Sequence, residues 1–214
     1  MSDSLTPDEI AALFTRADGS YLCARWGRPL APVVFGVDDA TLATVKGAFQ
    51  AVADLAGHEI AETDPELGAN TMVFFFRDWD ELPQVPNLDR LIEGLGPLVD
   101  RLKAAGANQY RVFRFDADGA INACFVFLRM DAELDAVPAE TLALSQVVQS
   151  MLLWSDLAFT DRSPLGQLAD GRVVLRPGIA GVLRAAYDPV MPAVAQDASH
   201  ALRLHARLNS DRLA

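Results

Sequence analysis

The sequence predicts an α+β protein, and three observations lead to this prediction. Residues 70–76 contain an unbroken apolar run (Met72-Val73-Phe74-Phe75-Phe76), which is typical of a strand buried on both faces of a sheet. Apolar residues recur at helical spacing between Asp39 and Gly57. Tyr110–Phe115 and Ala120–Leu128 flank the turn sequence Asp116-Ala117-Asp118-Gly119, which predicts a β-hairpin. We expect a sheet-rich part in residues 1–135 and a helical part in residues 136–214.

The elements before the apolar run follow from caps and breakers. Thr6, Pro7 and Glu9 have the spacing of a capping box and predict a first helix that ends near Asp18-Gly19. Asp38 or Asp39 should cap the second helix, and Gly57 should end it. Three strands are expected in the same region: Ser20–Trp26, Pro32–Gly36 and a short one at His58–Glu62.

The elements after residue 76 alternate between helices and the hairpin. Leu88–Ala105 predicts a helix that Gly94, Gly96 and Pro97 can split. The other segments expected in the second half are a helix at Pro138–Trp154, a loop at Asp156–Gly171, a short helix at Pro177–Tyr187 and a last helix at Ala193–Leu208.

Length and composition favour one globular unit. The chain has 214 residues, of which 51% are hydrophobic and 22% charged, so it can bury a substantial core as a single domain over 1–214. Cys23 and Cys124 are too few for a disulfide framework and indicate a reducing compartment. Acids precede any apolar run in Met1–Thr15, unlike a signal peptide, and no apolar run approaches the ~20 residues of a membrane span. We therefore expect a cytoplasmic protein without membrane contact.

Charge argues against nucleic acid as a partner. The net charge is −11, whereas non-specific nucleic-acid binding needs a basic surface. The charge is also uneven, because residues 162–214 carry 7 Arg and 4 acids on an otherwise acidic chain. This basic segment is either a solvated face or a site for an acidic partner or ligand.

The usual catalytic and cofactor signatures are missing from the sequence. There is no Walker loop, Gly-x-Gly-x-x-Gly, Gly-x-Ser-x-Gly, Cys-x-x-Cys or His-Glu-x-x-His, so we predict no cofactor. His200 and His205 are five residues apart, which turns the second ring by about 140° around a helix and makes a shared metal site improbable. Arg172 and Arg176 lie in a glycine-containing segment that opens a helix, which is either an anion site or an ordinary surface loop.

Several segments resemble a known family. They are Arg25-Trp26-Gly27-Arg28-Pro29-Leu30, Val33–Gly36, Asn70–Phe75, the hairpin with Cys124, and Leu144–Asp156. In this order they are similar to a bacterial family of unknown function with a zincin-type metalloprotease fold. The resemblance implies a mixed sheet with a long central helix and a helical C-terminal subdomain. In active zincins that helix carries His-Glu-x-x-His, and the equivalent positions in this chain run from Ser145 to Gln149.

The residues at those positions do not suit zinc chemistry. Zinc hydrolysis needs imidazole ligands and a carboxylate base, whereas Ser145 and Gln149 are poor ligands and Gln146 cannot exchange a proton. We therefore predict no bound metal. The first hypothesis is a non-catalytic binding or scaffold protein that holds a protein, a peptide or a small polar ligand in a relic cleft.

We expect that cleft to be the main concavity of the molecule, unless Trp154 or Phe159 fills it. The residues expected to line it are Ser145, Gln146, Gln149, Asp156, Arg172 and Arg176. The alternative hypothesis is a hydrolase of unknown class that uses acids near the cleft, such as Asp156 or Asp161.

Overall fold

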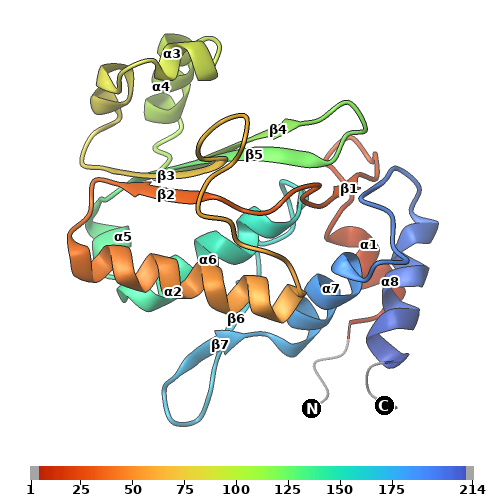
Figure 1. The fold of residues 1–214 in the computed structure, drawn as a ribbon. Coiled ribbons are helices and arrows are strands. Elements are labelled where there is room, and N and C mark those ends of the chain that lie inside the picture. Colours follow the sequence, from red (N-terminus) through yellow and green to blue (C-terminus); the bar gives the residue numbers. More distant parts are fainter. Residues whose placement is uncertain (1–4, 211–214) are drawn as a thin grey trace.

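The computed structural model describes residues 5–210, and its centre is a mixed four-stranded sheet (Figure 1). The strand order is β2-β3-β5-β4. Strands β2, β3 and β5 are parallel, and β4 runs antiparallel to β5, so β2 and β4 form the two edges. The strands are β2 (Pro32–Phe35), β3 (Thr71–Phe76), β4 (Gln109–Phe115) and β5 (Ile121–Arg129).

Two long helices cover the lower face of the sheet in Figure 1. They are α2 (Asp39–Ala56) and α6 (Ala139–Met151). Asp38 caps α2 by accepting a hydrogen bond from the Thr41 amide, and Gly57 ends the helix with a φ of 65°, which confirms both predicted signals. Apolar residues of α2, α6 and the strands share the larger core cluster. The prediction of one helix packed against the sheet, with the hairpin beside β3, is therefore confirmed.

The upper face carries a smaller helical layer. Its elements are η1 (Trp79–Gln84), α3 (Leu88–Leu91) and α4 (Leu95–Ala104). Together with Phe74, Phe125 and Phe127 they form a second core cluster over β3, β5 and β4. The long helix predicted for this region is split at Gly94, whose φ is 68°. Edge strand β2 lies beside this layer, and its Phe35 side chain stays 44% exposed.

The remaining elements connect the two ends of the chain. Strand β1 pairs with β8, and β6 pairs with β7 in a hairpin that projects at the bottom of Figure 1. The larger core cluster runs from Ile10 to Leu208, so the sheet-rich part and the helical part share it. These elements are α1 (Pro7–Ala12), β1 (Cys23–Ala24), α5 (Ala132–Asp135), β6 (Leu165–Gln167), β7 (Val173–Leu175), α7 (Pro177–Tyr187), β8 (Val194–Ala195) and α8 (Ser199–Ser210).

Several predicted boundaries are wrong, and pairing partners explain most of them. Helix α6 stops at Met151, three residues before the predicted end, because Leu152 becomes extended and bridges to Arg25. The last helix starts at Ser199, because Val194–Ala195 pairs with β1 instead. The loop predicted at Asp156–Gly171 contains strand β6.

The N-terminal predictions were too long. The first helix ends at Ala12, well before Gly19, and the strand expected over Ser20–Trp26 contracts to Cys23–Ala24 with isolated bridges beside it. The strand expected at His58–Glu62 is a single bridge between Leu30 and Ile60. Tertiary partners, which a local pattern does not specify, set these lengths.

Candidate functional site

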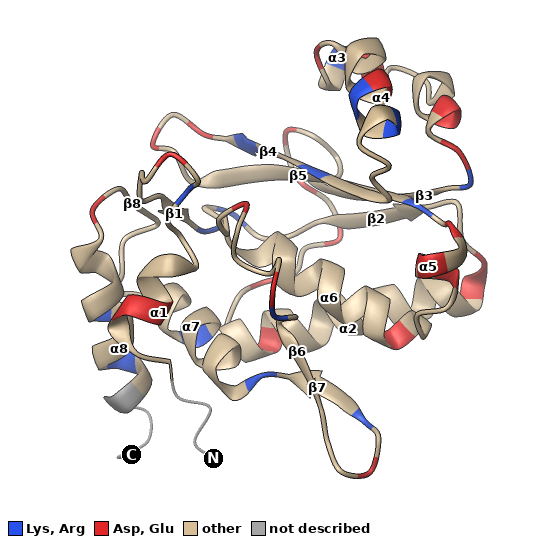
Figure 2. Cartoon of the chain, turned by 180° about the vertical axis from the view of Figure 1, so that it is seen from behind, with Lys and Arg blue, Asp and Glu red and all other residues tan. Residues whose placement is uncertain are grey.

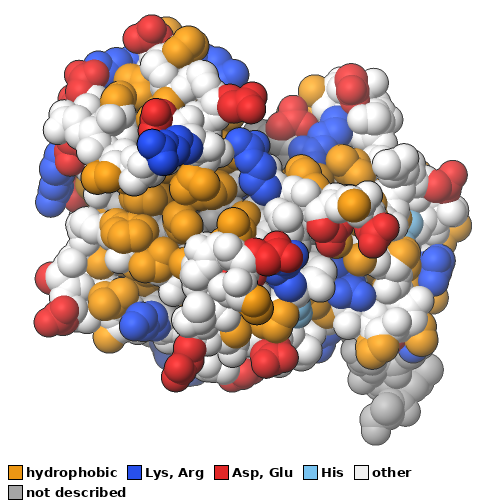
Figure 3. All heavy atoms as spheres, turned by 45° about the horizontal axis from the view of Figure 1, so that its top comes forward, with side chains coloured by type: hydrophobic (Ala, Val, Ile, Leu, Met, Phe, Trp, Pro, Cys, Tyr) orange, Lys and Arg blue, Asp and Glu red, His pale blue; other side chains and the backbone are white. Residues whose placement is uncertain are grey.

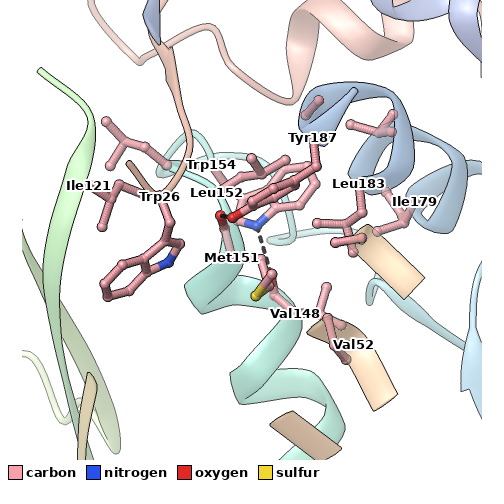
Figure 4. Close-up of a cluster of buried hydrophobic side chains, with 14 of the residues drawn as sticks. Trp26, Val52, Ile121, Val148, Met151, Leu152, Trp154, Ile179, Leu183 and Tyr187 are labelled. Carbon is pink, nitrogen blue, oxygen red and sulfur yellow. Dashed lines mark hydrogen bonds between the residues drawn. The ribbon is translucent and has the colours of Figure 1, made fainter. Parts of the chain in front are cut away.

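Three aromatic side chains hold the C-terminal end of α6. The last carbonyls of a helix have no partner inside the helix. Trp26 Nε1 donates to the Ser150 carbonyl at 2.8 Å, and Tyr187 Oη donates to that of Met151 at 2.7 Å. Trp154 Nε1 donates to Val148 O at 3.0 Å (Figure 4). These bonds come from three different segments and fix the position of α6 beneath the sheet.

The polar residues of α6 meet an arginine from edge strand β4. Arg111 donates to Gln146 Oε1 at 2.6 Å and to Gln149 Oε1 at 3.4 Å. Gln146 Nε2 in turn donates to Gln109 Oε1 at 2.9 Å, and Gln149 Nε2 donates to Ser145 Oγ at 3.0 Å. We call these five residues the Arg111 cluster. Within it, both glutamine amides use their oxygen and their nitrogen on partners from the chain itself.

The Arg111 cluster is buried and carries a positive charge. Gln146 is 5% exposed, and burial lowers the pKa of the Arg111 guanidinium. Its Nε is buried without a hydrogen-bond partner, and no ion pair joins Arg111 to a carboxylate within residues 5–210. Cys124 lies beside Arg111, and burial raises the pKa of its thiol to about 12. The cluster therefore offers a fixed cation and neutral amides, which is not an acid–base pair.

The other residues predicted for the relic cleft lie elsewhere. Asp156 is exposed and accepts a bond from Ser155 Oγ at 3.3 Å. Arg172 pairs with Asp170 at 2.8 Å next to the β6–β7 turn. Arg176 donates to the Ser163 carbonyl at 2.9 Å and lines a cavity of only about 70 Å³. None of these bonds reaches the Arg111 cluster, so the structure brings Ser145, Gln146 and Gln149 together but joins none of the other three to them by a bond.

Two larger cavities lie at the ends of β2 and β3. The first, the apolar groove, has a volume of about 600 Å³ and lies between β2 and the η1–α3 layer. The second, the acidic cavity, has about 550 Å³ and lies between the starts of α2 and α6 and helix α5. The two share four lining residues: Gly36, Phe75, Phe76 and Glu81. They form one continuous trough around the carboxyl ends of the parallel strands, where ligands of open α/β sheets commonly bind.

Aromatic rings line the apolar groove. Phe35 stacks on Phe74 with 4.7 Å between the ring centroids, and Phe74 stacks on Phe76 at 5.8 Å. Phe35 is 44% exposed and Leu91, across the groove, 38%. Figure 3 shows hydrophobic side chains gathered on this face below the part formed by α3 and α4. Contiguous exposed apolar surface of this kind marks interaction sites.

Three carboxylates and one guanidinium line the acidic cavity. Arg77 contacts Asp135 at 2.8 Å, with both side chains largely in solvent. Glu81 Oε1 accepts bonds from the amides of Arg77 and Asp78, each at 2.8 Å. The Thr41 amide bonded to the Asp38 carboxylate lowers the pKa of Asp38. Figure 2 shows the acidic helix α5 at this end of the sheet.

The expectation that the cleft beside Gln146 and Gln149 is the main concavity is wrong. None of the four cavities found within residues 5–210 is lined by either residue. Arg111 fills the space, not Trp154 or Phe159, which pack on each other at 5.1 Å. The sequence signal for the real cavities was the aromatic run in β3 next to the Phe35-Gly36 strand end, which we assigned to the core alone.

Histidines form no cluster that would suggest another site. His200 is buried, and its Nδ1 lies 2.9 Å from Tyr21 Oη. Among residues 5–210 no group of three or more His, Cys, Asp or Glu side chains is arranged to hold a metal ion. In the same part of the chain no helix is both long enough and apolar enough to cross a membrane.

Comparison with known proteins supplies no relative. No family model, no curated protein and no solved structure matches the chain. The functional argument therefore depends on the geometry of the chain itself.

Proposed function

We propose that the chain is a non-catalytic binding protein on a zincin-like fold, and that it holds a segment of a partner protein in the apolar groove. The observation that carries this proposal is the groove itself: about 600 Å³ of space beside an edge strand, walled by Phe35, Phe74 and Leu91. Burying apolar surface contributes about 25 cal/mol per Å². Exposed aromatic rings are also the side chains that most often dominate protein interfaces.

The edge of β2 supports a peptide as the occupant. Leu30 uses its amide and carbonyl on Glu59 and Ala61, away from β3, whereas the Ala31 carbonyl accepts bonds from β3 side. Because backbone groups alternate along a strand, the amide and carbonyl of Val34 also point away from β3. No hydrogen bond of either group occurs within residues 5–210. An extended segment can pair there and direct side chains into the groove.

The Arg111 cluster supports the absence of catalysis. On the zincin-like frame, Ser145, Gln146 and Gln149 occupy the positions of the ligands and the base. Here the Arg111 guanidinium takes the place that a metal cation would need, since both glutamine oxygens already accept from it. The alternative of a hydrolase using Asp156 or Asp161 gains no support, because both acids are exposed and neither lines a cavity found in the described residues.

The zincin-like assignment is supported by the placement of α6. This helix lies under a mixed sheet whose edge strand β4 is antiparallel, and its polar residues face that edge. A central helix beneath such a sheet is what the resemblance implies.

A selection experiment tests the proposal. The full chain is screened against a phage-displayed library of random peptides, and the selected peptides are titrated by fluorescence anisotropy. Phe35→Ser should weaken binding at least tenfold, because it removes the ring that forms the groove wall. Phe115→Ser is the matched control, since Phe115 is 43% exposed on the opposite edge strand, β4. If no peptide is selected, or if both variants lose binding equally, the proposal is rejected.

A further inference from the structure

We infer that the partner segment carries a lysine or arginine next to its apolar residues, and that this cation enters the acidic cavity while the apolar side chains fill the groove. The inference rests on the proposed function and adds the chemistry of the partner. Its starting point is that the two cavities share Gly36, Phe75, Phe76 and Glu81 and are therefore continuous. A ligand that occupies one reaches the wall of the other.

The trough is polarised along its length. Glu81 is the single charged residue that lines the apolar groove, and it lies at the junction with the acidic cavity. The acidic cavity adds Asp38, Asp135 and Arg77, so carboxylates outnumber cations three to one around the whole trough. A partner with an apolar part and a basic part matches this arrangement, whereas an acidic partner meets an excess of like charge.

Each charge in the cavity has a defined state. Asp38 is held in its ionised form by the Thr41 amide, because that hydrogen bond lowers the carboxyl pKa. Glu81 Oε1 is occupied by two backbone amides, while no hydrogen bond to Oε2 occurs within residues 5–210. The one cation, Arg77, already pairs with Asp135 through its Nη1. The cavity therefore retains carboxylate acceptors for an incoming ammonium or guanidinium group.

The reach of a peptide side chain agrees with this placement. Phe35 ends β2, Gly36 follows it, and Asp38 caps α2 two residues later. A segment paired along β2 at Val34 passes directly from the groove wall to these residues. One or two residues along an extended chain, at about 3.3 Å each, separate its contact with Phe35 from a side chain that reaches Asp38.

The test uses peptides that bind in the selection experiment and a matched pair of variants. Asp135→Asn removes a carboxylate of the cavity and frees Arg77 to repel a cation. Asp170→Asn is the control, because Asp170 also forms a solvent-exposed pair with an arginine, at 2.8 Å, but far along the chain in the β6–β7 turn. The peptides are also synthesised with each lysine or arginine replaced by glutamate. Affinities are measured by fluorescence anisotropy at low and at moderate salt.

We expect the selected peptides to combine apolar residues with Lys or Arg. Asp135→Asn should weaken their binding about fivefold, as for a partly exposed charge pair, and added salt should reduce the difference. Asp170→Asn should leave affinity unchanged, and the glutamate peptides should bind at least tenfold more weakly. If peptides need Phe35 but show no preference for basic residues, this inference is wrong while the proposed function stands. If no peptide needs Phe35, both fail.

Discussion

The two edges of the central sheet end in opposite ways. At β4, the Arg111 cluster closes the space between strand and helix, because every glutamine group there finds a partner in the chain itself. At β2, the Phe35 ring has a wall of rings on one side and solvent on the other, so the groove stays open. A binding surface is therefore found by asking which groups lack partners, and the position of a degenerate catalytic motif does not locate it.

The turn at the open edge should be the least tolerant position. Gly36 has a φ of 81°, and a Cβ there would lie 2.2 Å from the Phe75 carbonyl oxygen. We expect Gly36→Ala to cost about 3 kcal/mol or more in the free energy of unfolding, measured by urea denaturation. Gly19→Ala is the control, since Gly19 has a φ of 85° with open space around it, and should cost about 1 kcal/mol. Equal losses would show that strain alone, not the close packing of β2 on β3, governs this turn.

The closed edge should depend on its cation. Arg111→Ala leaves the oxygens of Gln146 and Gln149 without their donor and opens a hole at the strand–helix boundary. We expect a loss of about 3 kcal/mol in the free energy of unfolding. Arg114→Ala, on the same strand but exposed, removes one bond to the Leu91 carbonyl and should cost less than about 1 kcal/mol. An Arg111 variant as stable as the Arg114 variant would contradict the view that the guanidinium holds this edge together.

Thiol reactivity measures how closed that edge is. Cys124 lies behind Arg111, is fully buried, and has a pKa raised to about 12, so its reactive thiolate is scarce at pH 8. Cys23 is also buried, and burial raises its thiol pKa to about 12. We expect no reaction of the native protein with the disulfide reagent DTNB at pH 8 and two reactive thiols in urea. Reaction of one thiol before unfolding would mean that its surroundings open.

Local patterns predicted the parts of the fold that local chemistry determines. The α2 caps at Asp38 and Gly57, the hairpin turn at Asp116–Gly119 and the start of α7 at Pro177 follow from the residues at those positions. The pattern failed where a distant partner decides. Strand β8 exists because Cys23–Ala24 pairs with it, and α6 ends where Arg25 reaches Leu152.

The candidate site was predictable only in part. The resemblance placed Ser145, Gln146 and Gln149 together on one helix, and the structure agrees. It gave no sign of Arg111, because an arginine in a strand resembles any exposed charge until its partner across the sheet–helix boundary is known. The groove was missed because an aromatic run predicts burial, and only the tertiary arrangement leaves Phe35 uncovered.

The aromatic donors around α6 also equip the protein with two optical reporters. Trp26 and Trp154 bind carbonyls at the end of α6, in the larger core, whereas Trp79 lies in the smaller core and donates to the Ala107 carbonyl at 2.8 Å. Their fluorescence therefore follows the layers on opposite faces of the sheet separately. Variants that keep only one of these groups can report whether the layer above the sheet melts together with the helices below it, or comes apart first and carries the wall of the groove with it.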